Sequence, residues 1–184
     1  MYRQTNPWKG FALGLVGGLV GVMAMDYFQQ RISPLIFGSE SQESSHTGEH
    51  PHLSSITLVG RQHREDESAT AALGRILRTK TVGEEPDAGE KTDLSYLIHW
   101  AYGISQGGLY GATRAGVAGT DWWGGAIFGI GLWLLGDELI VPLLGLQEGP
   151  TAYSVQTHLN RAAMHWVYGT ATATATQLLT HLFA

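Results

Sequence analysis

Cysteine is absent from this 184-residue chain, which excludes disulfides and thiolate metal ligands. Charged residues are also scarce, at 15% of the chain, and they leave long stretches almost uncharged. The formal net charge of −5 argues against nucleic acid as a partner. The sequence contains no nucleophile elbow, phosphate loop or metalloprotease helix. We therefore expect a protein that is not an enzyme.

Four charge-poor stretches are each about as long as the roughly 17 to 25 residues that a helix needs to cross a bilayer. They predict transmembrane helices at about residues 8–30, 93–117, 122–146 and 157–183, within a single membrane domain over 1–184. The first stretch could instead be a signal peptide, but no clean cleavage site follows it. The sequence thus favours an all-α integral membrane protein with four transmembrane helices.

A long polar segment, residues 38–92, separates the first two stretches and is predicted to be an extramembrane loop. Apolar residues at helical spacing predict a short amphipathic helix over residues 68–80, preceded by an acidic run that suits the helix dipole. The loop also contains four histidines, of which two or three could bind zinc: His46, His50, His52 and His63. Their spacing matches no closed zinc site, so we favour a solvated segment.

Glycine recurs at four-residue spacing in the apolar stretches, a pattern that lets helix backbones approach closely in lipid. The glycines that we expect to pack helices together are Gly14, Gly18, Gly103, Gly107, Gly111, Gly125 and Gly129.

One sequence word occurs twice, as His-Trp-Ala-Tyr-Gly at 99–103 and His-Trp-Val-Tyr-Gly at 165–169. A second correspondence matches Gly14, Gly18 and Asp26 with a Gly, Gly, Asp set at the same spacings from residue 125 to residue 137. The repeated unit is therefore predicted to be a helix pair. Helices one and two would match helices three and four as parallel pseudo-repeats about an axis along the membrane normal.

Antiparallel helix pairs bring the end of one helix and the start of the next to the same membrane face. The sequence therefore predicts an intramembrane polar cluster of Asp26, His99, Asp137, Glu138, His158, Arg161 and His165. Ionisable groups at membrane depth are costly and are by default candidates for function. The first interpretation is a set of paired polar groups that fixes helix register, for example Arg161 with Asp137 or Glu138.

Three other interpretations of the cluster stay open. Imidazole beside carboxylate suits a proton or ion pathway, because histidine titrates near neutrality. His99 and His165 could supply the two axial ligands of haem b. Histidine with carboxylate could also hold a divalent metal. Close glycine packing argues against a large cofactor, so we expect none.

Several motifs resemble the YagU-like family of bacterial inner-membrane proteins, also named domain of unknown function 1440. The resemblance rests on Pro7–Gly10, on the glycine-rich helix that ends at Met25-Asp26, on 99–103, on 132–146 and on His158 with 165–169. It implies a multi-pass protein of the bacterial inner membrane and supplies no reaction. The polar motif residues of the family fall on Asp26, His99, Asp137, Glu138, His158 and His165.

These observations lead to one expected function. We expect a small non-enzymatic membrane protein that acts through packing, as an accessory subunit of a larger complex or as a homo-oligomer. Its partners would be the lipid bilayer and other membrane subunits or a second copy. Lys and Arg are balanced between the two sides. We favour cytoplasmic termini and a periplasmic long loop, because long loops translocate largely regardless of charge.

Overall fold

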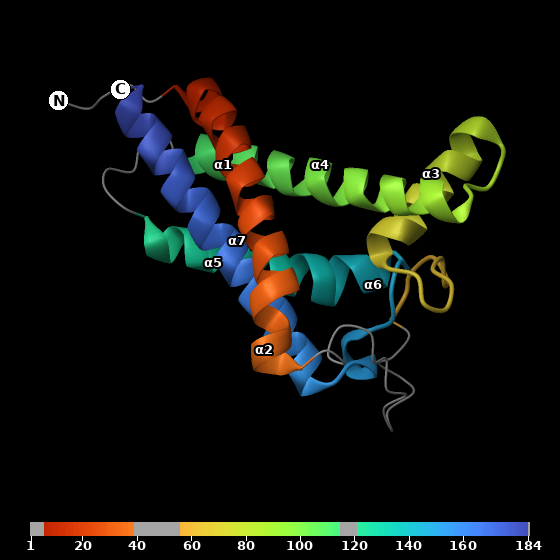
Figure 1. The fold of residues 1–184 in the computed structure, drawn as a ribbon. Helices are drawn as coiled ribbons and strands as arrows, with labels where there is room; N and C mark the ends of the chain where they lie inside the picture. The colour runs from red at the N-terminus through yellow and green to blue at the C-terminus, as the bar shows by residue number, and fades with distance from the viewer. Residues whose placement is uncertain (1–5, 39–55, 115–120, 184) are drawn as a thin grey trace. The chain divides into compact units, whose positions relative to one another are not determined.

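A computed structural model of the chain describes residues 6–38, 56–114 and 121–183 (Figure 1). The described residues form helices joined by turns and contain no β-strand, which confirms the predicted all-α class. The first helical stretch comprises α1 (Pro7–Tyr27), η1 (Phe28–Ile32) and α2 (Ser33–Phe37) and ends at Phe37. The later helices are α3 (Ala69–Val82), α4 (Ala88–Arg114), α5 (Trp122–Leu132), α6 (Val141–Leu143) and α7 (Val155–Leu182). A π-helical stretch, η3 (Trp133–Ile140), joins α5 to α6, and a 3-10 turn, η4 (Pro150–Ala152), precedes α7.

The first helix, α1 (Pro7–Tyr27), begins at Asn6, whose side-chain oxygen accepts from the Trp8 backbone N–H at 3.0 Å. It continues through a π-helical stretch, η1 (Phe28–Ile32), into α2 (Ser33–Phe37). The Ser33 N–H donates to the Phe28 oxygen, five residues back. Pro34 follows directly and has no N–H to continue the ladder. The stretch η3 likewise ends two residues before a proline, Pro142.

Two helices are long and apolar enough to cross a membrane: Pro7–Phe37, with 31 residues, and Trp122–Leu143, with 22. The described parts of the other two predicted spans are also helical, and α4 and α7 have 27 and 28 residues. These two helices are more polar, because α4 opens with Glu90, Lys91 and Asp93 and α7 carries Asn160 and Arg161 near its start. A total of four transmembrane helices therefore stays a prediction.

The chain divides into two compact units. The first comprises residues 1–39, 100–133 and 159–184, and the second comprises 40–99 and 134–158. The core of the first unit is formed by Val22, Met25, Met164 and Tyr168. Aromatic and aliphatic residues pack against it: Phe28, Trp100, Phe128 and Leu132. The core thus joins α1, α5, α7 and the second half of α4, and Figure 1 shows α1 running beside α7.

The second unit contains the amphipathic helix predicted within the polar segment. The structure confirms this helix as α3, which Ser68 caps by accepting from the Ala71 N–H at 3.2 Å. Gly83, with a φ of 86°, ends it in the left-handed conformation. The helix packs on the first half of α4: a Cβ on Gly74 would lie 2.9 Å from the Leu94 Cβ.

Candidate functional site

All seven residues of the predicted polar cluster are partly buried. Asp26, Arg161 and His165 belong to the first unit, whereas His99, Asp137, Glu138 and His158 belong to the second. In the first unit, the Nδ1 of His165 donates to the backbone oxygen of Arg161 at 2.9 Å, one turn earlier in α7. In the second unit, the structure brings together the side chains of Glu138 and His158. His46, His50 and His52 lie outside the described residues.

The imidazole of His158 lies between two oxygen acceptors. Its Nδ1 is 2.8 Å from Glu138 Oε1, and its Nε2 is 2.8 Å from the backbone oxygen of Pro150. The carbonyl can only accept, so Nε2 must carry a proton. The bond to Glu138 then needs a second proton, either on Nδ1 or on the carboxyl group. Both hydrogen bonds form together only while the pair holds this second proton.

The π-helical stretch η3 carries both Asp137 and Glu138. A π-helical turn holds one residue more than an α-turn and occurs often at functional sites. In η3 the Glu138 side chain is directed to His158 at the start of α7, within the same unit. The side chain of Gln147 donates to the backbone oxygen of Asp137. The π-helical stretch η3 is thus contacted by two later side chains, those of Gln147 and His158.

A second histidine in this unit, His63, also lies between a backbone oxygen and a carboxylate, but its two ring nitrogens have exchanged roles relative to His158. The Nδ1 of His63 is 2.8 Å from the Gly145 oxygen, and its Nε2 is 3.2 Å from Glu148 Oε1. In the sequence, His63 stands out only as one of the four histidines of the polar segment. Its partners lie more than 80 residues away, and no local pattern marks them.

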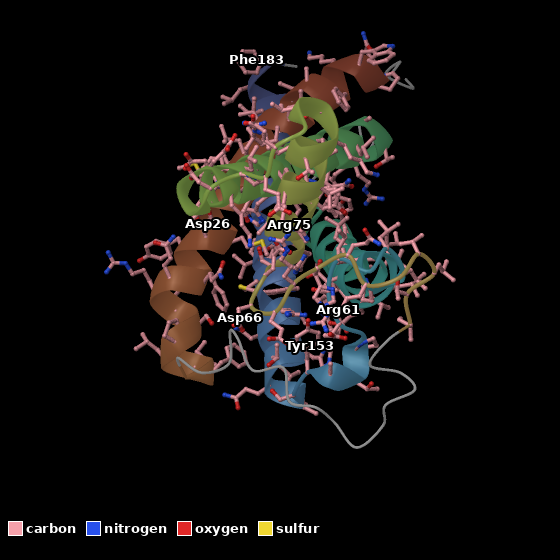
Figure 2. All side chains as sticks on the ribbon, turned by 90° about the vertical axis from the view of Figure 1, so that its right-hand side faces the viewer. Asp26, Arg61, Asp66, Arg75, Tyr153 and Phe183 are labelled. Carbon is pink, nitrogen blue, oxygen red and sulfur yellow. The ribbon has the colours of Figure 1, made fainter. Side chains whose placement is uncertain are left out.

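Glu67 is the ionic centre of the second unit, and sequence reasoning assigned it only to an acidic run before a helix. Its buried carboxylate accepts from Arg75 (labelled in Figure 2) at 3.0 and 2.9 Å and from Lys91 at 2.8 Å. The backbone N–H of Arg64 adds a bond at 3.0 Å. Burial raises the pKa of Glu67, but these hydrogen bonds outweigh it and lower the pKa to about 2. The carboxylate therefore fastens α3 to α4 and to the segment before α3.

A third polar centre lies in the first unit, where Asp121 caps α5. Its carboxylate accepts from Arg114 at 2.5 and 2.6 Å and from the Tyr110 hydroxyl at 2.7 Å. It also accepts from the Gly124 N–H at 3.2 Å. These contacts tie the end of α4 to the start of α5.

Small residues let α1 and α4 touch through their backbones. A Cβ on Gly107 would lie 2.6 Å from the Gly14 oxygen and 2.6 Å from the Gly18 nitrogen. A Cβ on Gly18 would lie 2.9 Å from the Gly103 oxygen, and one on Gly111 would lie 2.7 Å from the Gly14 Cα. Such distances leave room only for hydrogen at these positions.

The helices α5 and α7 touch in a similar way. A Cβ on Gly125 would lie 2.6 Å from the Gly169 oxygen, and one on Gly129 would lie 3.2 Å from the Gly169 Cα. Under the predicted correspondence Gly169 matches Gly103. Gly18 faces Gly103 and Gly107, whereas its counterpart Gly129 faces His165 and Gly169. The two pairs therefore use corresponding glycines with a register difference of four residues, which is one helical turn.

No family model matches the chain, and comparisons with curated proteins and with solved structures give no match. The resemblance to YagU-like proteins accordingly stays a prediction. Among residues 6–38, 56–114 and 121–183, no three His, Asp or Glu side chains gather closely enough to hold a metal ion.

The Glu138–His158 pair yields a prediction with a matched pair of variants. Glu138→Leu should lower the free energy of unfolding by about 1–3 kcal/mol, because Nδ1 of His158 loses its partner. Glu138→Gln should cost less, since its amide can donate to Nδ1 while Nε2 still donates to Pro150. Thermal unfolding in detergent would compare the two variants. Equal stability of both would show that the hydrogen bond contributes nothing.

Proposed function

We propose that the chain is a four-helix membrane protein that acts by packing, as an accessory subunit of a larger membrane complex or as a homo-oligomer. The observation that carries this proposal is the outward-facing apolar surface of Trp122–Leu143. Only 11% of its most apolar 18-residue window is buried, whereas the core helix of a water-soluble protein is mostly buried. Its exposed large side chains are Trp122, Trp123, Ile127, Leu134, Leu135, Leu139 and Ile140.

An apolar surface of this kind needs lipid or another protein against it, because large apolar patches are unfavourable in water. In Pro7–Phe37, 39% of the corresponding window is buried, and glycines form much of that buried side. Apolar residues outside and small residues at helix contacts are the arrangement expected in a bilayer, where apolar burial does not drive helix association. This distribution supports a role inside the membrane.

The glycine contacts support two pseudo-equivalent helix pairs, α1 with α4 and α5 with α7. Both pairs contact through glycines that correspond in sequence, although the register differs by one turn and α7 contributes Gly169 with Ala173 in place of a second glycine. We propose that α4 and α7 also cross the bilayer, with both termini on the cytoplasmic side and the polar segment 38–92 in the periplasm. The bacterial inner membrane is the proposed location, by resemblance alone.

Because the chain has no cysteine, single-cysteine variants test this proposal directly. Ile127→Cys and Leu135→Cys should resist a water-soluble maleimide in intact membranes and react after the protein is denatured in detergent. Glu84→Cys, in the exposed turn between α3 and α4, should react in membranes opened to both sides. Equal reaction at all three positions would overturn the membrane assignment.

A second experiment tests the subunit role. Native membranes would be extracted into lipid nanodiscs, and the affinity-purified protein would be analysed by mass spectrometry and by its native mass. A stoichiometric partner or a defined homo-oligomer is the expected result. A monomer without partners would contradict the packing role.

The Glu138–His158 pair supports a second candidate, a proton pathway. A carboxyl group in a π-helical stretch that shares one proton with an imidazole of α7 forms a pair chemically suited to proton transfer. Proton flux into liposomes containing the purified protein, followed with a trapped pH dye, would test this function. Glu138→Gln should abolish the flux while leaving the fold intact. No flux above empty liposomes would exclude this candidate.

A further inference from the structure

We propose that the turn at Leu58-Val59 inserts into the membrane–water interface beside the end of the Trp122–Leu143 helix. This inference rests on the proposed membrane location. Leu58 is 79% exposed and Val59 is 58% exposed, although both belong to a segment held firmly to its unit. These two adjacent, exposed, apolar side chains form the tip of a turn whose backbone is hydrogen-bonded to the rest of its unit.

The turn is attached to the end of the candidate membrane span. The Leu58 N–H donates to the Leu143 oxygen at 2.9 Å, and the Gln62 N–H donates to the Gly145 oxygen at 2.8 Å. His63 adds bonds from its backbone and its ring to the same Gly145 oxygen, at 3.0 and 2.8 Å. All these residues belong to the second unit. The turn is therefore bonded to the chain at Leu143, where the apolar helix ends, and at Gly145, two residues further on.

The length of that helix sets the depth of the turn. At the α-helical rise of 1.5 Å per residue its 22 residues would span at most about 33 Å, and the wider π-helical turns of η3 shorten this toward the roughly 30 Å hydrocarbon core of a bilayer. Trp122 and Trp123 lie at its start, where tryptophan favours the membrane interface. Leu143 then lies at the opposite interface. A turn bonded to Leu143 lies at that level, so the lipid bilayer is the surface that meets Leu58 and Val59.

The turn also satisfies several of its own backbone groups, as an apolar environment requires. Thr57 Oγ1 donates to the Gly60 oxygen at 3.1 Å and accepts from the Val59 N–H at 3.3 Å. The Gln62 side chain donates to the Val59 oxygen at 3.2 Å. Arg61 follows the apolar tip and pairs with Glu148 at 3.4 Å. The order of apolar tip and charged base suits a segment that lies across the interface.

Gly145 makes the attachment possible. Its φ of 67° is a conformation that favours glycine, and a Cβ on it would overlap the Gly60 oxygen and lie 2.9 Å from Thr57 Oγ1. The loop after the helix and the turn are thus shaped to fit each other.

Single cysteines at Leu58 and Val59, labelled with an NBD fluorophore, test the proposal in the full chain reconstituted into phosphatidylcholine–phosphatidylglycerol vesicles. Glu65→Cys, exposed in the same unit, is the water-facing control, and Leu135→Cys is the reference in the span. We expect blue-shifted emission at positions 58 and 59. We also expect stronger quenching by a shallow lipid nitroxide than by a deep one, and little quenching by iodide.

The other outcomes are distinct. Iodide quenching at positions 58 and 59 equal to that at position 65 would place the turn in water and overturn the inference. Shielding from both iodide and lipid nitroxides would mean that protein covers the turn, which would also overturn it. If Leu135→Cys escaped lipid quenching, the proposed membrane function itself would fail. Both turn variants would first be shown to unfold at the same temperature as the parent protein.

Discussion

Replacing Gly107 by alanine should lower the free energy of unfolding by about 3 kcal/mol, at the upper end of the cost of overpacking. The added methyl group would lie 2.6 Å from two backbone atoms of α1, the Gly14 oxygen and the Gly18 nitrogen. Backbone cannot rotate out of the way as a side chain can, so α1 and α4 would have to separate. In lipid, close packing is what holds such helices together, and separation removes it.

Gly131→Ala provides the matched control. Gly131 also lies in a helix, α5, but a Cβ there would meet no heavy atom within 4 Å. Alanine has the higher helix propensity by about 1 kcal/mol, so this variant should be as stable as the parent protein or slightly more stable. Circular dichroism during thermal unfolding in detergent would measure both. A Gly107→Ala protein as stable as Gly131→Ala would disprove the backbone contact between α1 and α4.

The second large effect is expected at Glu67. Glu67→Ala should destabilise the second unit by about 3–5 kcal/mol, the usual result of removing one partner of a buried ion pair. Arg75 and Lys91 would lose the carboxylate that neutralises them, and Arg64 would lose an acceptor for its N–H. Hydrogen exchange of residues 57–92, measured by mass spectrometry, should become faster in this variant.

Glu67 should also make the second unit sensitive to acid. Its pKa falls from 4.5 to about 2 on folding, so its stabilising effect is complete above about pH 4.5 and is lost as the pH falls toward 2. The shift corresponds to about 3 kcal/mol. Glu85→Gln is the control, because the Glu85–Arg64 pair is exposed and its loss should change exchange little. If Glu67→Ala retained parental exchange from pH 7 to pH 3, the ionic centre would have no structural role.

The positions of the helices could be predicted from the sequence, because apolar runs and capping residues are local signals. The predicted segment 122–146 corresponds to the observed helix Trp122–Leu143, and 157–183 corresponds to Val155–Leu182. The amphipathic helix predicted over residues 68–80 corresponds to α3, Ala69–Val82, since apolar residues at helical spacing mark it. Local chemistry was sufficient in each of these cases.

The partners of polar groups could not be predicted in the same way. Glu67 meets Arg75 and Lys91, and His63 meets Glu148, through the tertiary fold, and many other charged residues have equal claims by sequence alone. The expected antiparallel pairing of the helices predicted one cluster of seven residues. The structure shows Glu138 with His158 but divides the seven between two units. A pattern can place a residue on a helix, but it does not choose the partner of that residue.

The π-helical stretch η1 has a consequence for the phase of the first helix. In an uninterrupted α-helix, Ser33 would lie about 80° around the axis from Met25, away from the buried side. The one extra residue in a π-turn removes about 100°, which brings Ser33 back to within about 20° of Met25. There the Ser33 hydroxyl is fully buried and donates to Asn160 Oδ1 of α7 at 2.8 Å. A wide turn thus lets one helix present a single continuous face to α7 over more turns than a 3.6-residue period permits.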